Sequence, residues 1–176
     1  MNNKTIFCDY TFSTQILDIF NEAILNSSAL YDYQPRTMEN MKTWFENKIK
    51  GNFPVIGVID ENEKLLGFGS YGTFRAWPAY KYTIEHSLYI HKDHRGVGLG
   101  RIILDEIIKN AINQNYHCLI AGIDSSNLRS IRLHKSFGFE FSGRIKQVGY
   151  KFSNWLDLEF YQLLLKTPIS PNEDQL

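Results

Sequence analysis

The stretch His94-Arg95-Gly96-Val97-Gly98-Leu99-Gly100-Arg101 follows a short apolar segment, residues 81–91, and leads into a longer periodic segment. Three alternating glycines permit backbone conformations with positive φ, and such turns expose successive backbone N–H groups. A helix that starts here points the positive end of its dipole into the same space. The two flanking arginines add charge-assisted hydrogen bonds, so the stretch predicts a site for a phosphate or pyrophosphate.

Two well-known phosphate-binding loops do not match this stretch. The loop G-x-x-x-x-G-K-[ST] needs a lysine and a hydroxyl after its last glycine, whereas Arg101 and Ile102 follow Gly100. The dinucleotide-binding fingerprint needs Gly or Ala three places after its second glycine, where this chain again has Arg101. On these residues alone, a glycine-rich turn between a strand and a helix remains the alternative.

The segments on either side of the loop predict strands and helices in a mixed order. Strands are expected at residues 5–10, 55–59, 65–74, 81–91 and 118–123, with one or two more between Phe139 and Leu165. Helices are expected from Thr37 to Gly51 and after Gly100. Two more are expected, one capped by Ser13 and one capped by Ser125 or Ser126 and running to about Phe137. This order predicts an α/β fold built on one mixed sheet of the α+β kind. Helices are expected on both faces of that sheet. Residues 1–166 are expected to form one domain, and residues 167–176 a flexible tail.

Length and charge limit the classes of partner. A chain of 176 residues has the size of one domain, and 19 Lys+Arg balance 19 Asp+Glu. A formal net charge of +0 gives no overall attraction to nucleic acid or to an anionic membrane. The chain has no apolar run of signal-peptide or membrane-span length, so we expect a cytoplasmic protein.

The cysteines and several histidines show no metal-ligand spacing. Cys8 and Cys118 stand 110 positions apart, and both are expected to be buried thiols. His91, His94 and His117 have no spacing that converges with a carboxylate. No metal site is predicted.

Two motifs together resemble the GNAT superfamily of N-acetyltransferases. Residues 95–100 match the three fixed positions of its acetyl-CoA loop, [QR]-x-x-G-x-[GA], and Asn127 with residues 133–139 is similar to its segment N-(x)n-hydrophobic-Y-x-K-x-G-F. Further stretches resemble the branch of phosphinothricin and methionine sulfone/sulfoximine acetyltransferases, at residues 21–24, 54–55, 70–75, 83–90, 121–124 and 151–157. The resemblance implies the GNAT fold with splayed central strands. It also implies acetyl-CoA as acetyl donor, a small amino-acid-like substrate acetylated on its α-amine, and a homodimer.

The resemblance also implies the catalytic residues. Acetyl transfer to an amine needs proximity, a proton acceptor for the amine, a donor for the developing oxyanion and a proton for the departing thiolate. Glu85 is the expected general base, and an outward-facing strand carboxylate is the alternative. His134 stands where the wider superfamily usually has Tyr. Its imidazole could return a proton to sulfur, help to deprotonate the amine, or serve a structural role.

Binding residues follow from the same resemblance. Arg75 is expected to hold the substrate carboxylate through two parallel hydrogen bonds. The other expected substrate contacts, beside Glu85 itself, are Ala76, Trp77, Tyr80, His86 and Ser87. The expected cofactor contacts are the main chain of Leu88, Tyr89 and Ile90, the loop residues Arg95, Gly96, Val97, Gly98, Leu99, Gly100 and Arg101, and the side chains of Asn127 and Ser136.

Two alternatives remain open from the sequence. One is acetylation of a protein N-terminus, a polyamine or an aminoglycoside. Acidic loops would favour cationic substrates, whereas residues 75–82 contain Arg75 and Lys81 and no acid. The other is a CoA-binding module without catalysis, which the presence of Glu85 and Arg75 disfavours.

Overall fold

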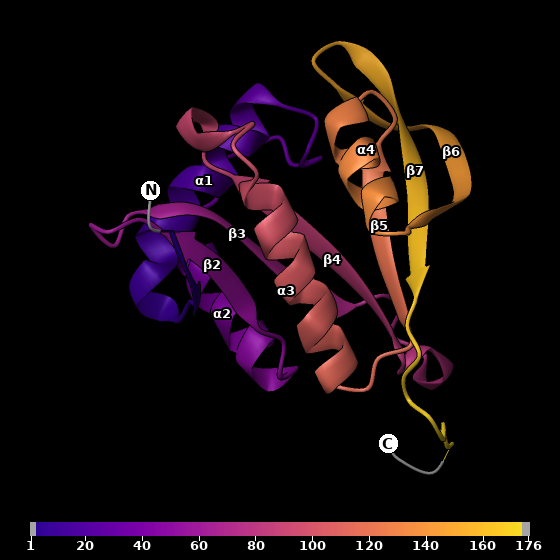
Figure 1. Cartoon of the computed structure of the whole chain (residues 1–176). Helices are drawn as coiled ribbons and strands as arrows, with labels where there is room; N and C mark the ends of the chain where they lie inside the picture. Colours follow the sequence, from indigo (N-terminus) through magenta and orange to yellow (C-terminus); the bar gives the residue numbers. More distant parts are fainter. Residues whose placement is uncertain (1–2, 174–176) are drawn as a thin grey trace.

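The computed structural model describes residues 3–173, which form one seven-stranded sheet in the order β1-β2-β3-β4-β5-β7-β6 (Figure 1). The strands are β1 Lys4–Phe7, β2 Val55–Ile59, β3 Leu65–Thr73, β4 Thr83–Ile90, β5 Cys118–Asp124, β6 Glu140–Lys151 and β7 Asn154–Leu164. β4 and β5 pair in parallel, and the other neighbours are antiparallel. The sheet is therefore mixed, as the order of elements predicts.

Four helices cover the sheet, two on each face. α1 (Ser13–Asn26) and α2 (Met38–Lys50) lie on one face, and α3 (Leu99–Asn113) and α4 (Leu128–Ser136) lie on the other, in front in Figure 1. Short 3-10 turns, η1 (Tyr10–Phe12), η2 (Pro78–Tyr80) and η3 (Lys92–His94), precede α1, β4 and the glycine loop. The prediction of helices on both faces is confirmed.

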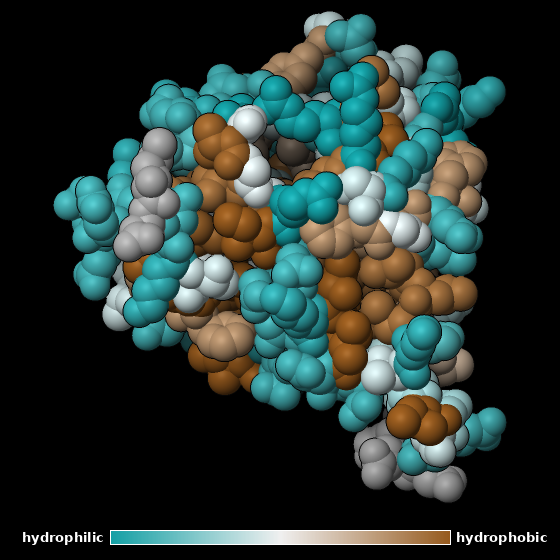
Figure 2. Space-filling model, in the orientation of Figure 1, coloured by the Kyte–Doolittle hydropathy of each residue, from teal (hydrophilic) through white to brown (hydrophobic). Residues whose placement is uncertain are grey.

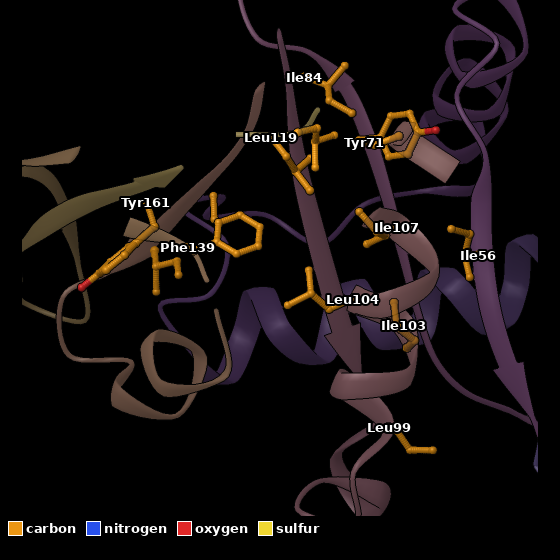
Figure 3. Close-up of a cluster of buried hydrophobic side chains, with 14 of the residues drawn as sticks. Ile56, Tyr71, Ile84, Leu99, Ile103, Leu104, Ile107, Leu119, Phe139 and Tyr161 are labelled. Atoms are coloured by element: carbon orange, nitrogen blue, oxygen red, sulfur yellow. The ribbon is translucent and has the colours of Figure 1, made fainter. Parts of the chain in front are cut away.

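Each face has its own apolar core. Ile103, Leu104 and Ile107 of α3 are fully buried against the sheet on the α3 and α4 side (Figure 3). On the α1 and α2 side, the ring of Phe20 makes edge-on contacts with Phe68 and Tyr89, whose centroids lie 4.9 and 5.1 Å away. The two cores hold the sheet rigidly between the helix pairs.

α2 begins one residue after the predicted start at Thr37, which is its N-terminal cap, and it ends before Gly51 as predicted. The hydroxyl of Thr37 accepts from the N–H of Asn40, and the Asn40 side chain accepts in turn from the N–H of Thr37. Gly51 is the C-terminal cap. Such reciprocal capping satisfies backbone donors that the helix itself leaves unpaired.

Two predicted helix caps are wrong. We expected Ser13 to cap α1 and Ser125 or Ser126 to cap α4. Phe12 is the N-terminal cap of α1, because the 3-10 turn before the helix continues directly into it. Asn127 caps α4, since its Oδ1 accepts from the N–H of Ser130 at 3.2 Å. Both boundaries are set by the preceding turn rather than by the serine.

β4 and β5 separate part-way along their length. Their pairing covers only Thr83–His86 against Cys118–Ala121, although both strands continue beyond it. Figure 1 shows the two strands close together at one end and apart at the other. β3 continues to pair with the outer edge of β4, and β7 with that of β5. The expected splayed central strands are therefore present.

Hydrogen bonds join the segment after β7 to the body of the domain. Thr167 Oγ1 donates to the carbonyl of Tyr116 at 2.6 Å, and the N–H of Asn172 donates to Tyr82 Oη at 3.2 Å. Residues 174–176, which belong to the expected flexible tail, lie outside the described part of the chain, and the tail stays a prediction. Within residues 3–173, none of the helices has the length and apolar character that crossing a membrane requires.

A buried lysine joins the last hairpin to the end of α1. Lys151, the last residue of β6, is 5% exposed, and its Nζ donates to the carbonyls of Ile24, Ser27 and Leu30 at 2.6, 2.9 and 2.6 Å. Burial lowers the pKa of this ammonium, while its three acceptors satisfy all three of its donors. The contact fixes the loop between α1 and α2 against the hairpin.

We expect Lys151→Met to destabilise the protein by about 3 kcal/mol, because the variant keeps the apolar stem but leaves buried carbonyls without their donor. Urea unfolding followed by circular dichroism measures the change in the free energy of unfolding. Lys146→Met, at an exposed position of the same strand, is the matched control and should change little. Equal unfolding midpoints for the two variants would contradict this account.

Candidate active site

The separation of β4 from β5 opens a slot through the sheet. The slot has a volume of about 80 Å³ and is bounded by Ser87–Tyr89 of β4 and by Gly122–Asp124 of β5. Asn127, Ser130 and His134 of the α4 region line it on one face of the sheet, and Ala29 of the loop after α1 lines it on the other. Figure 2 shows a hollow beside α4 near the start of α3. The slot thus connects the two faces of the sheet.

The walls of the slot are the facing edges of β4 and β5, which do not pair with each other here. On β4 the residues from Ser87 to Ile90 pair with β3 alone, because β5 has already turned away. Buried backbone N–H and C=O groups are nearly always paired, so such an edge favours an extended ligand with amide groups of its own. The pantetheine arm of CoA has that chemistry.

The glycine loop has the backbone expected of an anion cradle at two of its three glycines. Gly96 and Gly98 have φ of 87° and 91°, and Gly98 is the N-terminal cap of α3. Gly100 lies within the helix, and its φ is not positive. A Cβ there would lie 3.1 Å from Leu133 Cδ2, so this glycine allows α3 and α4 to approach closely. The expectation of three left-handed glycines is corrected to two.

The two arginines of the loop point to different partners. The guanidinium of Arg95 forms an ion pair with Glu22 of α1, and its Nε donates to the Ile90 carbonyl at 3.2 Å. This corrects the expectation that both side chains line the anion cradle. Arg101 does reach α4, where its Nη2 donates to Ser136 Oγ at 2.9 Å. The structure therefore brings together Arg101 and Ser136, two of the expected cofactor contacts.

Glu85 lies on the α1 and α2 face of β4, close to the slot. A Cβ on Gly122 would lie 3.0 Å from Glu85 Oε1, so the carboxylate is packed directly against the backbone that bounds the slot. Burial raises the pKa of Glu85, and the charge of Arg75 partly opposes the rise. A raised pKa makes this carboxylate a better proton acceptor than an exposed glutamate.

His86 does not lie beside Glu85. We expected it in the substrate pocket, but successive strand residues point to opposite faces of a sheet. The ring of His86 is accordingly buried on the α4 face, with its Nε2 3.0 Å from His134 Nε2. Burial lowers the pKa of both rings. Ser87 does share the face of Glu85, and it lines the slot.

The expected substrate loop is exposed. Arg75 lies over the ring of Phe74, with its Cζ 5.1 Å from the ring centroid, and Tyr80 contacts the edge of the same ring. Ala76 is exposed, and Trp77 is 74% exposed. The charge of Arg75 acts on Glu85, so the start of this loop lies close to that carboxylate. Contacts of Ala76, Trp77 and Tyr80 with a substrate stay predictions.

Sequence reasoning missed three features of the slot. Gly122 has no side chain and therefore makes room for Glu85, Tyr31 Oη donates to Asp124 Oδ2 at 2.9 Å, and Ala29 closes one face. The signal for Asp124 was available, because a carboxylate at the end of a buried strand needs a partner. No sequence pattern identified Ala29, whose position depends on the loop that Lys151 holds.

No three His, Cys, Asp or Glu side chains within residues 3–173 come together as a group that could hold a metal ion. Both cysteines in this range are free thiols, and burial raises the pKa of Cys8 to about 12.

One family model matches most of the chain. Residues 13–159 match the model of the acetyltransferase (GNAT) domain. The chain belongs to the GNAT acetyltransferase family. The family and the fold inferred from the sequence motifs are confirmed, and acetyl-CoA is the acetyl donor of this family.

Three proteins illustrate the similarity of this acetyltransferase to known ones. It is 41% identical to an L-methionine sulfoximine/L-methionine sulfone acetyltransferase of Pseudomonas aeruginosa over 85% of its own chain and 87% of that protein. It is 28% identical to a phosphinothricin N-acetyltransferase of Streptomyces coelicolor over 84% and 87% of the two chains. A structure of an acetyltransferase from Salmonella typhimurium with its cofactor acetyl-CoA has a TM-score of 0.92 and 37% identity, covering 98% and 99%.

We expect Gly122→Ala to lower the kcat/KM of this acetyltransferase about tenfold, because the new methyl group displaces the Glu85 carboxylate from the slot. Steady-state release of CoA thiol measures the effect. Gly72→Ala is the matched control: Gly72 pairs with Glu85 across β3 and β4, but its added methyl group would make only an ordinary 3.7 Å contact with Lys48. Equal activity in both variants would refute the proposed crowding.

Proposed function

We propose that this acetyltransferase transfers the acetyl group of acetyl-CoA to the α-amine of a small amino-acid-like substrate of the methionine sulfone, methionine sulfoximine or phosphinothricin type. The observation that carries the proposal is the position of Glu85, whose carboxylate lies against Gly122 at the slot between β4 and β5. The named activities of the relatives support the choice of substrate class.

Glu85 acts as the general base. Its carboxylate accepts a proton from the amine, directly or through water, while the amine attacks the thioester carbonyl that acetyl-CoA supplies. The chain needs no acyl-enzyme, because the thioester already has a leaving group. The N–H groups along the unpaired edge of β4 at residues 88–90 donate to the oxygen that becomes negative.

The cofactor is held at several points along the slot. The N–H groups of Gly96 to Arg101 and the dipole of α3 bind its pyrophosphate. Arg101 and Ser136 add side-chain donors there, and Asn127 lies further along the slot. Arg95 contributes through its main chain, because Glu22 holds its guanidinium.

Arg75 selects the substrate by its carboxylate. The guanidinium fork can donate two parallel hydrogen bonds to a carboxylate, and its charge already reaches Glu85. An amino acid bound this way places its α-amine between Arg75 and the base. A polyamine or an aminoglycoside would instead place cations beside Arg75 and Lys81, in a loop without acids.

The protein works as a cytoplasmic homodimer. β6 is an edge strand, and the hairpin of β6 and β7 exposes a group of large apolar side chains, namely Phe141, Ile145, Val148, Tyr150, Phe152, Trp155 and Leu164. Exposed apolar side chains of this number favour a covered surface. Free cysteines agree with a reducing compartment. Analytical ultracentrifugation gives the mass, and a monomer at micromolar concentration would exclude the dimer.

Glu85→Gln should lower kcat about 100-fold or more at neutral pH, because the amide cannot accept the amine proton. The wild-type kcat should rise with pH as the buried carboxylate ionises, at a pH above that of an exposed glutamate, since burial raises its pKa. The variant should lose this rise. A pH profile of kcat for both proteins measures it, and an unaltered profile would exclude Glu85 as the base.

Arg75→Ala should raise the KM for amino acids far more than the KM for their amides, because only the acids carry the carboxylate that Arg75 binds. The measurement uses a panel of candidate amine substrates, and release of the CoA thiol gives the rate with each. The panel contains methionine sulfone, methionine sulfoximine, phosphinothricin, their amides where they exist, spermidine and an alanine-terminated peptide. Equal effects on acids and amides would exclude the clamp. No thiol release with any amine of the panel would exclude the proposed function.

A further inference from the structure

Two buried histidines meet at the closed end of the slot. His86 is the last residue of β4 that still pairs with β5, and His134 lies near the end of α4. Their Nε2 atoms are 3.0 Å apart. His86 is 6% exposed and His134 is 3% exposed. Both residues line the slot. The pair therefore closes the slot where the two strands begin to part.

The outer nitrogen of each ring faces a backbone carbonyl. His86 Nδ1 lies 2.9 Å from the Ile120 oxygen, and His134 Nδ1 lies 2.7 Å from the Ser130 oxygen. A carbonyl only accepts, so each Nδ1 must carry a hydrogen. The short contact between the Nε2 atoms needs a hydrogen as well, because two lone pairs at that distance repel. Three contacts require three protons, whereas two neutral imidazoles supply two.

A neutral pair fits this geometry less well. Ser130 Oγ lies 3.3 Å from His134 Nδ1, so the hydroxyl could donate to a ring that carries its own proton on Nε2. That arrangement would place the Nδ1 lone pair 2.7 Å from the Ser130 carbonyl oxygen. The neutral pair would therefore lose the 2.7 Å hydrogen bond from His134 Nδ1 to the Ser130 carbonyl and have a repulsive contact in its place. It would gain only the long 3.3 Å hydrogen bond from Ser130 Oγ.

The charged side chains on the elements around the histidine pair contact other groups or lie on the other face of the sheet. Glu85 of β4 lies on the opposite face of the sheet, Lys135 of α4 lies over the Tyr161 ring, and Asp124 of β5 accepts from Tyr31 and Ser126. Glu159 of β7 forms an ion pair with Arg144. The Phe139 ring, packed against both histidines, carries no charge.

The balance of burial and hydrogen bonding fixes how many protons the pair can hold. Burial lowers the pKa of both rings, the charge of His134 lowers that of His86 further, and the carbonyls of Ile120 and Ser130 raise both. Two adjacent imidazolium ions in this environment would repel strongly, so the pair holds at most one extra proton. Because burial opposes the charge, the pair gives that proton up readily.

We propose that His86 and His134 act together as one acid, holding a single extra proton between their Nε2 atoms and returning it to the sulfur of CoA as the thiol departs. This inference rests on the proposed function. His86 is a positioning residue, since it acts through His134, whose region lines the slot together with Ser130 and Asn127.

The protons and electrons of this step balance. The amine nitrogen forms its bond to the acetyl carbon and gives one proton to Glu85. The bond between the acetyl carbon and sulfur breaks, its electron pair stays on sulfur, and the His86–His134 pair supplies the proton that makes the thiol. The pair is then neutral and regains a proton from water, while Glu85 releases its own.

The first test is a pH titration of the wild-type, full-length protein by nuclear magnetic resonance with ¹⁵N-labelled histidine, alone and with CoA. The expected result is that three of the four ring nitrogens of the pair carry protons at low pH and that both rings lose one shared proton with a common midpoint. Two protons at every pH at which the protein is folded would overturn the proposal. This readout requires no acetyl transfer, so it separates failure of this inference from failure of the proposed function.

The second test compares His86→Phe and His86→Gln with His117→Gln, an exposed control whose Nδ1 lies 2.9 Å from the Thr167 carbonyl oxygen. His86→Phe should lower kcat about tenfold and move the alkaline limb of its pH profile by about one unit to lower pH, because a lone buried His134 holds its proton less tightly. His86→Gln, which can still hydrogen-bond Nε2, should recover part of both. The amine KM and the control should change little. A lower kcat with an unmoved pH profile would mean a structural role alone and would overturn the proposal.

Discussion

The parting of β4 from β5 after His86 is the constraint on which the rest of this structure depends. Pairing up to that residue keeps the sheet continuous, and loss of pairing beyond it leaves two backbone edges in need of partners. The outer edges of both strands remain fixed by β3 and β7, so the slot cannot close by collapse of the sheet. An unsatisfied edge inside a rigid sheet is a binding site for an extended amide-bearing ligand, and acetyl-CoA is such a ligand.

The same parting divides the chemistry between two faces. Alternation along β4 sends Glu85 toward α1 and α2, and sends His86 toward α4. The glycine loop and Arg101 lie on the side of α3 and α4, whereas Arg75 acts on Glu85 from the other side. In the proposed reaction the amine and the cofactor thus approach from opposite faces and meet in the slot. At Gly122 an added Cβ would crowd the Glu85 carboxylate, at 3.0 Å from its Oε1.

The sequence predicts much of this molecule, and its failures have physical causes. Local patterns predicted the strands, the extent of α2 to within one residue and the loop of residues 94–101, because these depend on neighbours along the chain. The placement of His86 beside Glu85 overlooked the alternation of side chains along a strand, and the ion pair of Arg95 with Glu22 was missed because these residues are distant in the sequence. The resemblance to the family supplied Glu85 and His134, for which no local pattern suffices. Side-chain direction and long-range pairing required the structure.

Burial acts on both the proposed base and the proposed acid of this site. Removing a carboxylate from water disfavours its charged form, so burial raises the pKa of Glu85 and makes it a stronger proton acceptor. Removing an imidazolium from water also disfavours its charged form, which lowers the pKa of His86 and His134 and makes either a stronger proton donor. One physical effect therefore moves the two groups in the directions that acetyl transfer needs. The sheet between them prevents the direct ion pair that would cancel both shifts.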